Sequence, residues 1–239
     1  MKALIGHTGF VGSNLSEQTQ FDRYYNSKNI EEISGQQFEL IVCAGVSSVK
    51  WKANKQPKED FAQIQRLIKN LEKTKFKKLI LISTIAVYDN PADNAYGQNR
   101  LYLETYLKNH FDDVSVVRLP SLFGDGLRKN AIYDLLNKEE SYLPHQDSTF
   151  QYYCLDLLWQ DIIIMQNAKL KTLNIATEPI LFHDILKLFK SDYLCTDPEK
   201  VVHENMLTAH SIHWGRTGPY LYSKDEIIER FQRFIKENA

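Results

Sequence analysis

Residues 2–18 read KALIGHTGFVGSNLSEQ, and this stretch decides the fold. Its first apolar residues run straight into glycines, which is typical of a buried strand that enters a tight turn. Apolar side chains then follow at roughly helical spacing: Phe10, Val11 and Leu15. Three glycines in the spacing GxxGxxG run from the end of the strand into the start of the helix: Gly6, Gly9 and Gly12. The stretch therefore predicts a strand, a glycine-rich turn and a helix.

The three glycines have separate physical roles in such a turn. The first permits the sharp bend, the second lets a pyrophosphate approach the backbone, and the third lets helix and strand pack closely. The phosphates then lie at the helix N-terminus, where free N–H groups favour anions. Because the trio lies between a strand and a helix, it predicts a dinucleotide site. A tight turn without a ligand is the alternative.

The rest of the chain alternates strands with helices. Further strands are expected at residues 39–45, 78–84, 114–120 and 172–177. Helices are expected at residues 57–73, 96–109 and 223–238, the last with Ser223 as N-cap and Glu226 three residues on. This alternation predicts an α/β fold, a doubly wound parallel Rossmann sheet with a small C-terminal substrate lobe. We expect a dinucleotide-binding domain over residues 1–125 and a lobe interleaved with the sheet over residues 126–239.

Composition excludes several classes of function. The 29 basic and 30 acidic residues nearly cancel, so no nucleic-acid partner is expected. Cys43, Cys154 and Cys195 lie far apart, which argues against disulfides and zinc and suits a reducing cytoplasm. The histidines of residues 203–213 match no common metal motif, so no metal is expected. Neither a signal peptide nor a membrane span is predicted, and we expect a cytoplasmic protein.

The residues after the second strand bear on the choice of cofactor. Sites for NAD often carry a carboxylate there, which holds the ribose hydroxyls. If residues 23–26 form that strand, Ser27 and Lys28 come next. A hydroxyl and a cation suit a 2′-phosphate better than a free ribose, which favours NADP over NAD. Lys28 is also compatible with an ordinary surface lysine.

Several motifs occur in a recognisable order: GHTGFVG (6–12), ELIVCAG (39–45), ISTIAVY (82–88), AYGQNR (95–100), VVRLPSLFG (116–124) and LNIAT (173–177). Together they resemble the extended short-chain dehydrogenase/reductase family, the NAD(P)-dependent epimerase/dehydratase group that works on nucleotide sugars. The glycine turn most resembles that of the NADP-using GDP-fucose synthases. The likeness covers residues 1 to about 190, so the chain is similar to a shortened member.

The resemblance implies a Ser/Thr–Tyr–Lys catalytic set. Tyr96 would exchange a proton with the substrate oxygen while hydride passes to or from nicotinamide. Ser83 or Thr84 would hydrogen-bond the same oxygen, since family members differ in which of the two positions serves. Arg100 stands where the family has the lysine that binds the nicotinamide ribose and lowers the pKa of the tyrosine.

The resemblance also implies binding residues. Together with Ser27 and Lys28, the cofactor would contact Gly6, Thr8, Gly9, Phe10, Val11, Gly12, Ala44, Gly45, Arg100 and Pro120. The substrate, a small molecule, would contact Ser121, Lys129 and Asn130. Dimerisation through a two-helix face is common in the family, so the resemblance is compatible with a homodimer.

A cation beside a tyrosine favours ionisation of the phenol, and this argument does not depend on the resemblance. A free phenol titrates near pH 10, about 4 kcal/mol from neutrality. A fixed cation in a partly dry site can remove a good part of that difference. A tyrosine and a cation one helical turn later give this geometry. Taken alone, the two residues would be an ordinary i, i+4 surface pair.

The sequence also departs from the family pattern. Arginine replaces lysine at position 100, so it keeps the charge but cannot relay a proton. The segment between Val87 and Tyr96 is short, Ser121 stands where many epimerases have Asn, and the C-terminal part is reduced. The resemblance leads us to expect an NAD(P)-dependent oxidoreductase or epimerase/dehydratase for a carbohydrate-like substrate, with or without a linked nucleotide. The alternative is a catalytically decayed NAD(P)-binding sensor or scaffold.

Overall fold

The structure is a computed structural model that describes residues 1–139 and 143–238. The chain forms two compact units. The first unit comprises Met1–Leu119 and Trp159–Leu173, and the second comprises Pro120–Leu158 and Asn174–Ala239. The boundary predicted at residue 125 falls inside the second unit.

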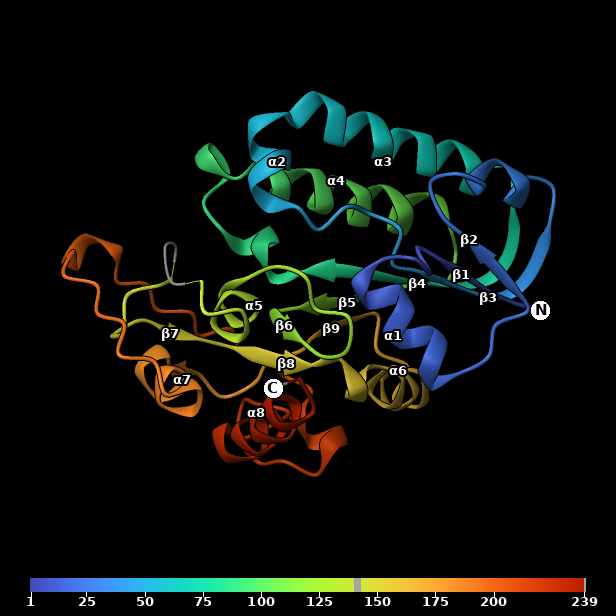
Figure 1. Cartoon of the computed structure of the whole chain (residues 1–239). Helices are drawn as coiled ribbons and strands as arrows, with labels where there is room; N and C mark the ends of the chain where they lie inside the picture. The colour runs from blue at the N-terminus through green and yellow to red at the C-terminus, as the bar shows by residue number, and fades with distance from the viewer. Residues whose placement is uncertain (140–142, 239) are drawn as a thin grey trace. The chain divides into compact units, whose positions relative to one another are not determined.

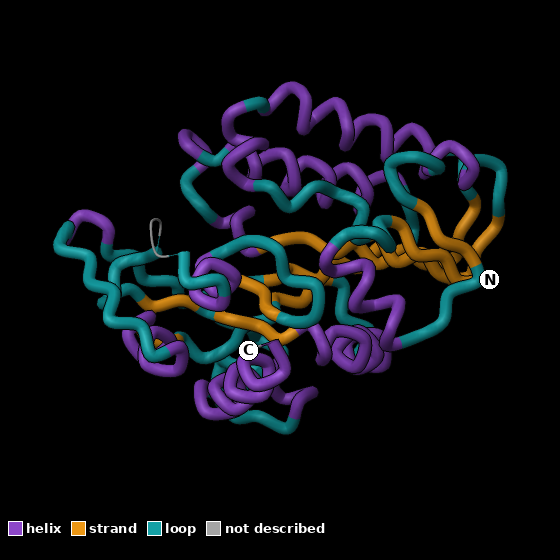
Figure 2. The backbone as a smooth tube through the Cα atoms, viewed as in Figure 1, coloured by secondary structure: helices purple, strands orange, loops and turns teal. Residues whose placement is uncertain are grey.

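A six-stranded sheet organises the first unit (Figures 1 and 2). Its strands are β1 (Lys2–Ile5), β2 (Arg23–Tyr25), β3 (Gln37–Cys43), β4 (Lys75–Thr84), β5 (Val114–Leu119) and β9 (Thr172–Asn174). They lie in the order β2-β1-β3-β4-β5-β9, and the pairs from β2 to β5 are parallel. The predicted Rossmann-like, doubly wound α/β fold is confirmed.

Helices cover both faces of this sheet. They are α1 (Phe10–Gln18), α2 (Lys50–Lys55), α3 (Pro57–Leu71), α4 (Ala95–His110) and α6 (Leu158–Asn167), with short 3-10 turns η1 (Ile30–Ile33), η2 (Ile85–Tyr88) and η3 (Pro91–Asp93). Helices α3 and α4 lie on one face, and α1 and α6 lie on the other (Figure 1). The face under α3 and α4 holds a continuous apolar core that includes Ile41, Leu81, Leu67 and Leu103.

The strand order determines where a ligand can bind. Strands β2 and β3 flank β1 on opposite sides, so the chain winds outward from β1 in both directions. Open sheets of this kind bind ligands outside the carboxyl ends of the strands at that switch point. The glycine turn follows β1 directly, and it therefore lies at this point.

The described residues of the second unit form short strands and three helices. Strand β6 (Ser121–Phe123) runs parallel to β8 (Tyr152–Cys154), and β7 (Thr149–Phe150) runs antiparallel to β10 (Ile180–Leu181). The helices are α5 (Ala131–Leu136), α7 (Phe182–Phe189) and α8 (Lys224–Asn238), with 3-10 turns η4 (Leu155–Leu157), η5 (Pro198–Lys200) and η6 (Ser211–Trp214). Its core combines leucines and isoleucines with the aromatic side chains of Phe123, Tyr152, Phe182 and Phe231.

The predicted start of the C-terminal helix is confirmed. The Ser223 N–H donates to Glu226 Oε2 at 2.8 Å, and the Glu226 N–H donates to Ser223 Oγ at 3.3 Å. These reciprocal bonds form a capping box. Over the residues described, the structure contains no helix that combines the length and the apolar character needed to cross a bilayer.

Candidate functional site

The turn after β1 brings three strands together. The Gly6 N–H donates to the Tyr25 carbonyl at 2.7 Å, and the Ala44 N–H donates to the Ile5 carbonyl at 2.8 Å. Gly6 has φ +91°, and a Cβ there would lie 2.5 Å from the Ala44 carbonyl carbon. Only glycine fits this position, because both the backbone conformation and the close approach exclude a side chain. Gly45 is constrained by proximity alone, since its Cβ would lie 2.7 Å from the Ile5 Cγ2 methyl group.

The other two glycines of the turn shape the start of helix α1. A Cβ on Gly12 would lie 2.6 Å from the Gly6 carbonyl carbon, so helix and turn pack backbone against backbone. Gly9 is the N-cap of α1 and is exposed, and a Cβ there would meet only the Gly6 carbonyl oxygen, at 3.3 Å. A glycine cap leaves the N–H groups of the first turn without a side-chain acceptor. The turn therefore presents a backbone surface suited to an anion.

The remaining predicted residues of this turn lie around the same helix start. Thr8 is exposed, and the side chains of Phe10 and Val11, the first two residues of α1, are half-buried. Their backbone N–H groups belong to the free first turn of the helix.

The end of β2 differs from the expected register by one residue. The strand ends at Tyr25, so Asn26 comes first after it, and Ser27 and Lys28 follow as exposed residues. The Asn26 amide lies 3.3 Å from His7 Nε2, and its Oδ1 accepts a bond from the Lys28 N–H at 2.8 Å. The sequence reasoning missed Asn26, although side chains of this type commonly bond the backbone two residues on.

Ser83 and Thr84 end strand β4 and point to opposite faces of the sheet. The Ser83 hydroxyl donates to Glu104 Oε1 at 2.6 Å, on the face covered by α4. Thr84 Oγ1 accepts a bond from the Ala86 N–H at 3.2 Å, which leaves its hydroxyl hydrogen able to donate elsewhere. The two hydroxyls are therefore not equivalent.

Glu104 also holds a half-buried arginine. Its carboxylate, 1% exposed, receives Arg118 Nη2 at 2.5 Å and Arg118 Nε at 3.1 Å. The Arg118 guanidinium lies 4.9 Å from the centroid of the Tyr88 ring and also bonds the Tyr88 hydroxyl. Burial alone would lower the pKa of Arg118, but the hydrogen bonds and charge of Glu104 outweigh it and raise the pKa. The sequence analysis did not anticipate this cluster.

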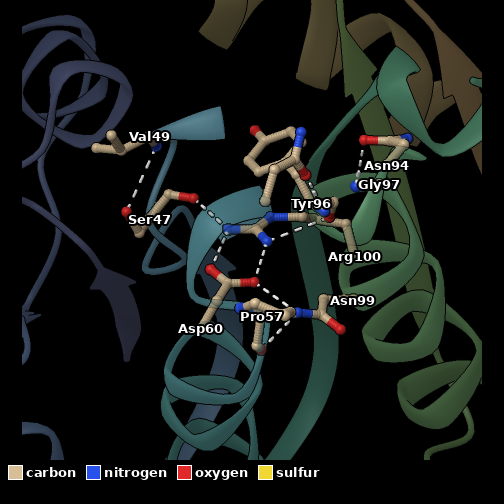
Figure 3. A network of polar contacts seen from close by, with 10 residues as sticks. Ser47, Val49, Pro57, Asp60, Asn94, Tyr96, Gly97, Asn99 and Arg100 are labelled. Atoms are coloured by element: carbon tan, nitrogen blue, oxygen red, sulfur yellow. Dashed lines mark hydrogen bonds and ion pairs between the residues drawn. The ribbon is translucent and has the colours of Figure 1, made fainter. Parts of the chain in front are cut away.

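Tyr96 and Arg100 are both buried in the first two turns of α4, with 9% and 4% of their surface exposed. The guanidinium carbon of Arg100 lies 3.9 Å from the centroid of the Tyr96 ring (Figure 3). A cation over an aromatic face in this desolvated setting is a favourable contact. The pair is therefore part of the interior and is not an exposed i, i+4 pair.

Asp60, from the first turn of α3, binds the same guanidinium (Figure 3). Its Oδ1 receives Arg100 Nη2 at 2.8 Å, and its Oδ2 receives Arg100 Nη1. Arg100 Nη2 also donates to the Ser47 carbonyl, and Nη1 donates to the Tyr96 carbonyl at 3.2 Å. Asn99 adds a bond to Asp60 Oδ2 at 2.8 Å. Both terminal nitrogens of Arg100 are thus held by protein groups.

The N-terminus of α4 is fixed against the end of β4. Asn94 caps the helix by accepting the Gly97 N–H at 3.0 Å, and its amide donates to the Ala86 carbonyl at 2.6 Å. The Tyr96 N–H donates to Asn54 Oδ1 at 2.8 Å. A Cβ on Gly97 would lie 2.8 Å from the Ala86 carbonyl carbon, so the helix touches the turn after β4 through its backbone. These contacts locate Tyr96 close to the segment that follows Thr84.

The predicted substrate residues belong to the second unit, as does Pro120, which is buried. Ser121 opens β6, and its N–H donates to the Gln151 carbonyl at 3.2 Å. Lys129 has an exposed side chain, yet nearby protein partly shields its ammonium from water, and this lowers its pKa.

Asn130 is occupied by its own loop. Its Oδ1 caps α5 by accepting the N–H groups of Ile132 and Tyr133 at 3.0 and 3.1 Å, and its amide donates to the Leu122 carbonyl at 2.8 Å. It does so at φ 110°, a conformation that costs a non-glycine residue of order 1–3 kcal/mol. No group of three or more metal-binding side chains occurs within residues 1–139 and 143–238.

No known family model and no curated protein matches the sequence. Solved structures do share the fold. A UDP-N-acetylglucosamine 4-epimerase from Methanobrevibacter ruminantium superposes with a TM-score of 0.75 at 15% identity, over 98% of this chain and 96% of that one. A dTDP-4-dehydrorhamnose reductase from Bacillus anthracis, in complex with NADP, gives 0.72 at 15% identity over 99% and 98%. RMD from Pseudomonas aeruginosa, complexed with NADPH, gives 0.72 at 12% over 99% and 98%.

Proposed function

We propose that the protein is an NAD(P)-dependent oxidoreductase or epimerase/dehydratase for a carbohydrate-like, nucleotide-linked small molecule. One observation carries the proposal: a buried tyrosine on α4 is fixed beside the end of β4, in a sheet whose switch point holds a backbone cradle. The three superposed proteins support it, because two of them are named as enzymes of sugar nucleotides and two are complexed with NADP or NADPH.

The residues of the turn fit the pyrophosphate of a dinucleotide. Gly9 leaves room in front of the helix N-terminus, and Gly6 and Gly12 let the backbone close behind it. Gly6, Thr8, Gly9 and the first residues of α1 would hold the phosphates, and Ala44 and Gly45 would line the adenosine side. A bound nicotinamide dinucleotide supplies the carbon that accepts or donates a hydride.

The chain's own residues would manage the proton and the oxygen. The Tyr96 hydroxyl gives a proton to the substrate oxygen during reduction and takes it back during oxidation. Thr84 is our candidate for the hydroxyl that orients this oxygen, since its hydrogen is not used by the backbone bond. Ser83 donates to Glu104 and would support the end of the strand.

NADP is our preferred cofactor. The end of β2 offers Asn26, Ser27 and Lys28 and no carboxylate, which suits a ribose 2′-phosphate better than free hydroxyls. Lys28 is exposed and can reach an approaching anion.

A second candidate function is an NAD(P)-binding sensor or scaffold without turnover. The observation that favours it is the engagement of Arg100 with Asp60 and the Ser47 carbonyl. In an enzyme of this kind Arg100 would bind the nicotinamide ribose, but here its guanidinium is hydrogen-bonded to protein groups.

The first test is a fluorescence titration with NADPH and, separately, NADH. We expect NADPH to bind more tightly than NADH, and Gly9→Ala to weaken binding at least tenfold because its methyl group enters the phosphate space. Gly218→Ala is the matched control, since a Cβ there meets nothing within 4 Å. Failure of both nucleotides to bind below about 1 mM would refute the proposal.

The second test separates the two candidate functions. Purified protein is assayed with NADPH and nucleotide-linked keto-sugars, and Tyr96→Phe is assayed beside it. An enzyme loses turnover in the variant and keeps its affinity for NADPH. A sensor binds NADPH equally in both proteins and turns over no substrate in either.

A further inference from the structure

The Asp60 carboxylate is central to the cluster around Tyr96, although it does not touch the tyrosine. It is 7% exposed and binds both terminal nitrogens of Arg100 in the two-pronged geometry that guanidinium and carboxylate favour. Asn99 holds the same carboxylate from α4, at 2.8 Å, so the orientation of Asp60 is fixed from two positions (Figure 3).

The hydrogen bonds to Asp60 determine the position of the Arg100 guanidinium. Its guanidinium carbon lies 3.9 Å from the centroid of the Tyr96 ring. Its other bonds go to the Ser47 carbonyl, in the loop after β3, and to the Tyr96 carbonyl. One side chain thereby connects α3, α4 and the β3 loop, and the Tyr96 ring packs on it.

The electrostatic result is as important as the geometry. A lone guanidinium over the ring would favour the phenolate strongly, because opposite charges within a few ångströms stabilise each other in a dry site. A carboxylate in contact with that guanidinium cancels most of the effect. The ring therefore lies against a pair whose net charge is zero.

The other charged groups on the packed elements are exposed to solvent or paired with other residues. Tyr96 contacts Ala53 of α2 and Ala86 of η2. The remaining charged or titratable side chains of α2, the first turn of α3, η2 and the inner face of α4 are Lys50, Lys52, Lys55, Lys58, Glu59, Tyr88 and Glu104; the first six are exposed, and Glu104 binds Arg118. Lys50 is also paired with Asp89 at 2.8 Å.

We infer that Asp60 is a positioning residue for Tyr96: through Arg100 it fixes the phenol ring and the Ser47 loop, and it neutralises the cation beside the ring. In this chain the tyrosine works next to a closed Asp–Arg pair instead of next to a free cation. That Tyr96 exchanges protons with a substrate rests on the proposed function, whereas the control of its ionisation by Asp60 does not.

The test measures ionisation of Tyr96 without cofactor or substrate. The protein is labelled with ¹³C at the tyrosine Cζ, and Tyr96→Phe identifies the Tyr96 signal by its loss. The signal is followed from neutral to strongly alkaline pH in the wild type and in Asp60→Asn. We expect the midpoint in the variant to fall by about one to two pH units, because Arg100 is left uncompensated. An unchanged midpoint would overturn the inference.

Two further variants cover the case in which Asp60→Asn does not fold. Arg100→Gln leaves the carboxylate alone near the ring and should raise the midpoint, while the Asp60→Asn/Arg100→Gln double variant restores neutrality and should return it to the wild-type value. Glu39→Gln, which removes an exposed partner of Lys77, is the control and should leave it unchanged. A purely structural role for Asp60 predicts no such opposite shifts. Failure of NADPH to bind would refute the proposed function, but the shifts in the Tyr96 midpoint are expected whether or not NADPH binds.

Discussion

Helix α4 contributes to two ion pairs one turn apart, and they differ in burial and in what surrounds them. Arg100 reaches Asp60 on the neighbouring helix, with 4% and 6% of the two side chains exposed. Glu104 reaches Arg118 on strand β5, with 2% and 12% exposed, and Arg118 continues to the Tyr88 ring, which is 59% exposed. The first pair is closed on all sides, and the second leads from the core to the surface.

The comparison shows how one helix face can hold charges for different purposes. Burying an ion pair gains little over an apolar contact, but leaving one member alone is costly. A buried pair such as Asp60–Arg100 therefore fixes the positions of its two side chains, but replacing either residue leaves an uncompensated buried charge. A pair with one edge at the surface is more tolerant, because water can replace a missing partner.

The largest effect is expected for Asp60→Ala. It leaves the buried Arg100 without a counter-charge, which should cost about 3–5 kcal/mol of folding free energy. Urea unfolding followed by circular dichroism measures it. The double variant Asp60→Ala/Arg100→Met should recover most of the loss. A cost below about 1 kcal/mol for the single variant would show that water reaches the pair and that it is not closed.

Glu104→Gln should be less costly. The amide keeps the shape and can still accept the Ser83 hydroxyl, and Arg118 retains Tyr88 and partial access to water. The loss of a charge-assisted hydrogen bond predicts about 1.5–3 kcal/mol in the same urea experiment. If Glu104→Gln lowers the free energy of unfolding more than Asp60→Ala does, the Glu104–Arg118 pair is the less tolerant of the two, contrary to our expectation.

Ser83→Ala tests the hydrogen bond that Glu104, the buried member of the second pair, receives from Ser83. It removes one neutral donor from a carboxylate that Arg118 still holds, so about 1 kcal/mol is expected. Substrate turnover should fall far less than in Thr84→Val, in which the proposed oxygen anchor is lost. Equal losses of turnover in both variants would contradict the separate roles assigned to the two hydroxyls.

The smallest effect is expected for an exposed pair. Lys77 and Glu39 lie 2.8 Å apart on neighbouring strands with more than half of each side chain in water. The hydrogen bond from Lys77 lowers the pKa of Glu39, yet solvent screening leaves such pairs with little net value. Glu39→Gln should leave the urea midpoint unchanged. A clear shift would mean that the amino edge of the sheet is less solvated than its exposure indicates.

The parts of the molecule that could be predicted are those with local causes. The glycine turn is confined to residues 6–12, and the contacts that constrain Gly9 and Gly12 lie within it, although Gly6 also meets the distant Ala44 carbonyl. The long strands are apolar runs in the sequence, and the long helices have apolar residues at helical spacing. The sheet and the helices on both of its faces are therefore predicted correctly. The capping box at Ser223 and Glu226 is local in the same way.

The unpredicted parts depend on contacts between distant positions. Asp60 looks like an ordinary acidic residue in a first helical turn, and its partner lies 40 positions later. The same holds for Glu104, which meets Arg118 only once α4 packs on the sheet. Strands β7 and β10 have two residues each, too few for a period to be seen. The β2 register was one residue off because a three-residue strand has no marked end.

Gly97 has a consequence for how this sequence can change. A Cβ on this residue would lie 2.8 Å from the Ala86 carbonyl carbon, so any side chain would separate α4 from the turn after β4. In a saturation library screened for function, position 97 should therefore be as intolerant as position 12, although only position 12 belongs to the proposed nucleotide cradle. Intolerance to substitution would then have two different causes in one protein. At position 12 it would reflect the proposed ligand-binding surface, and at position 97 it would reflect close packing of backbone against backbone.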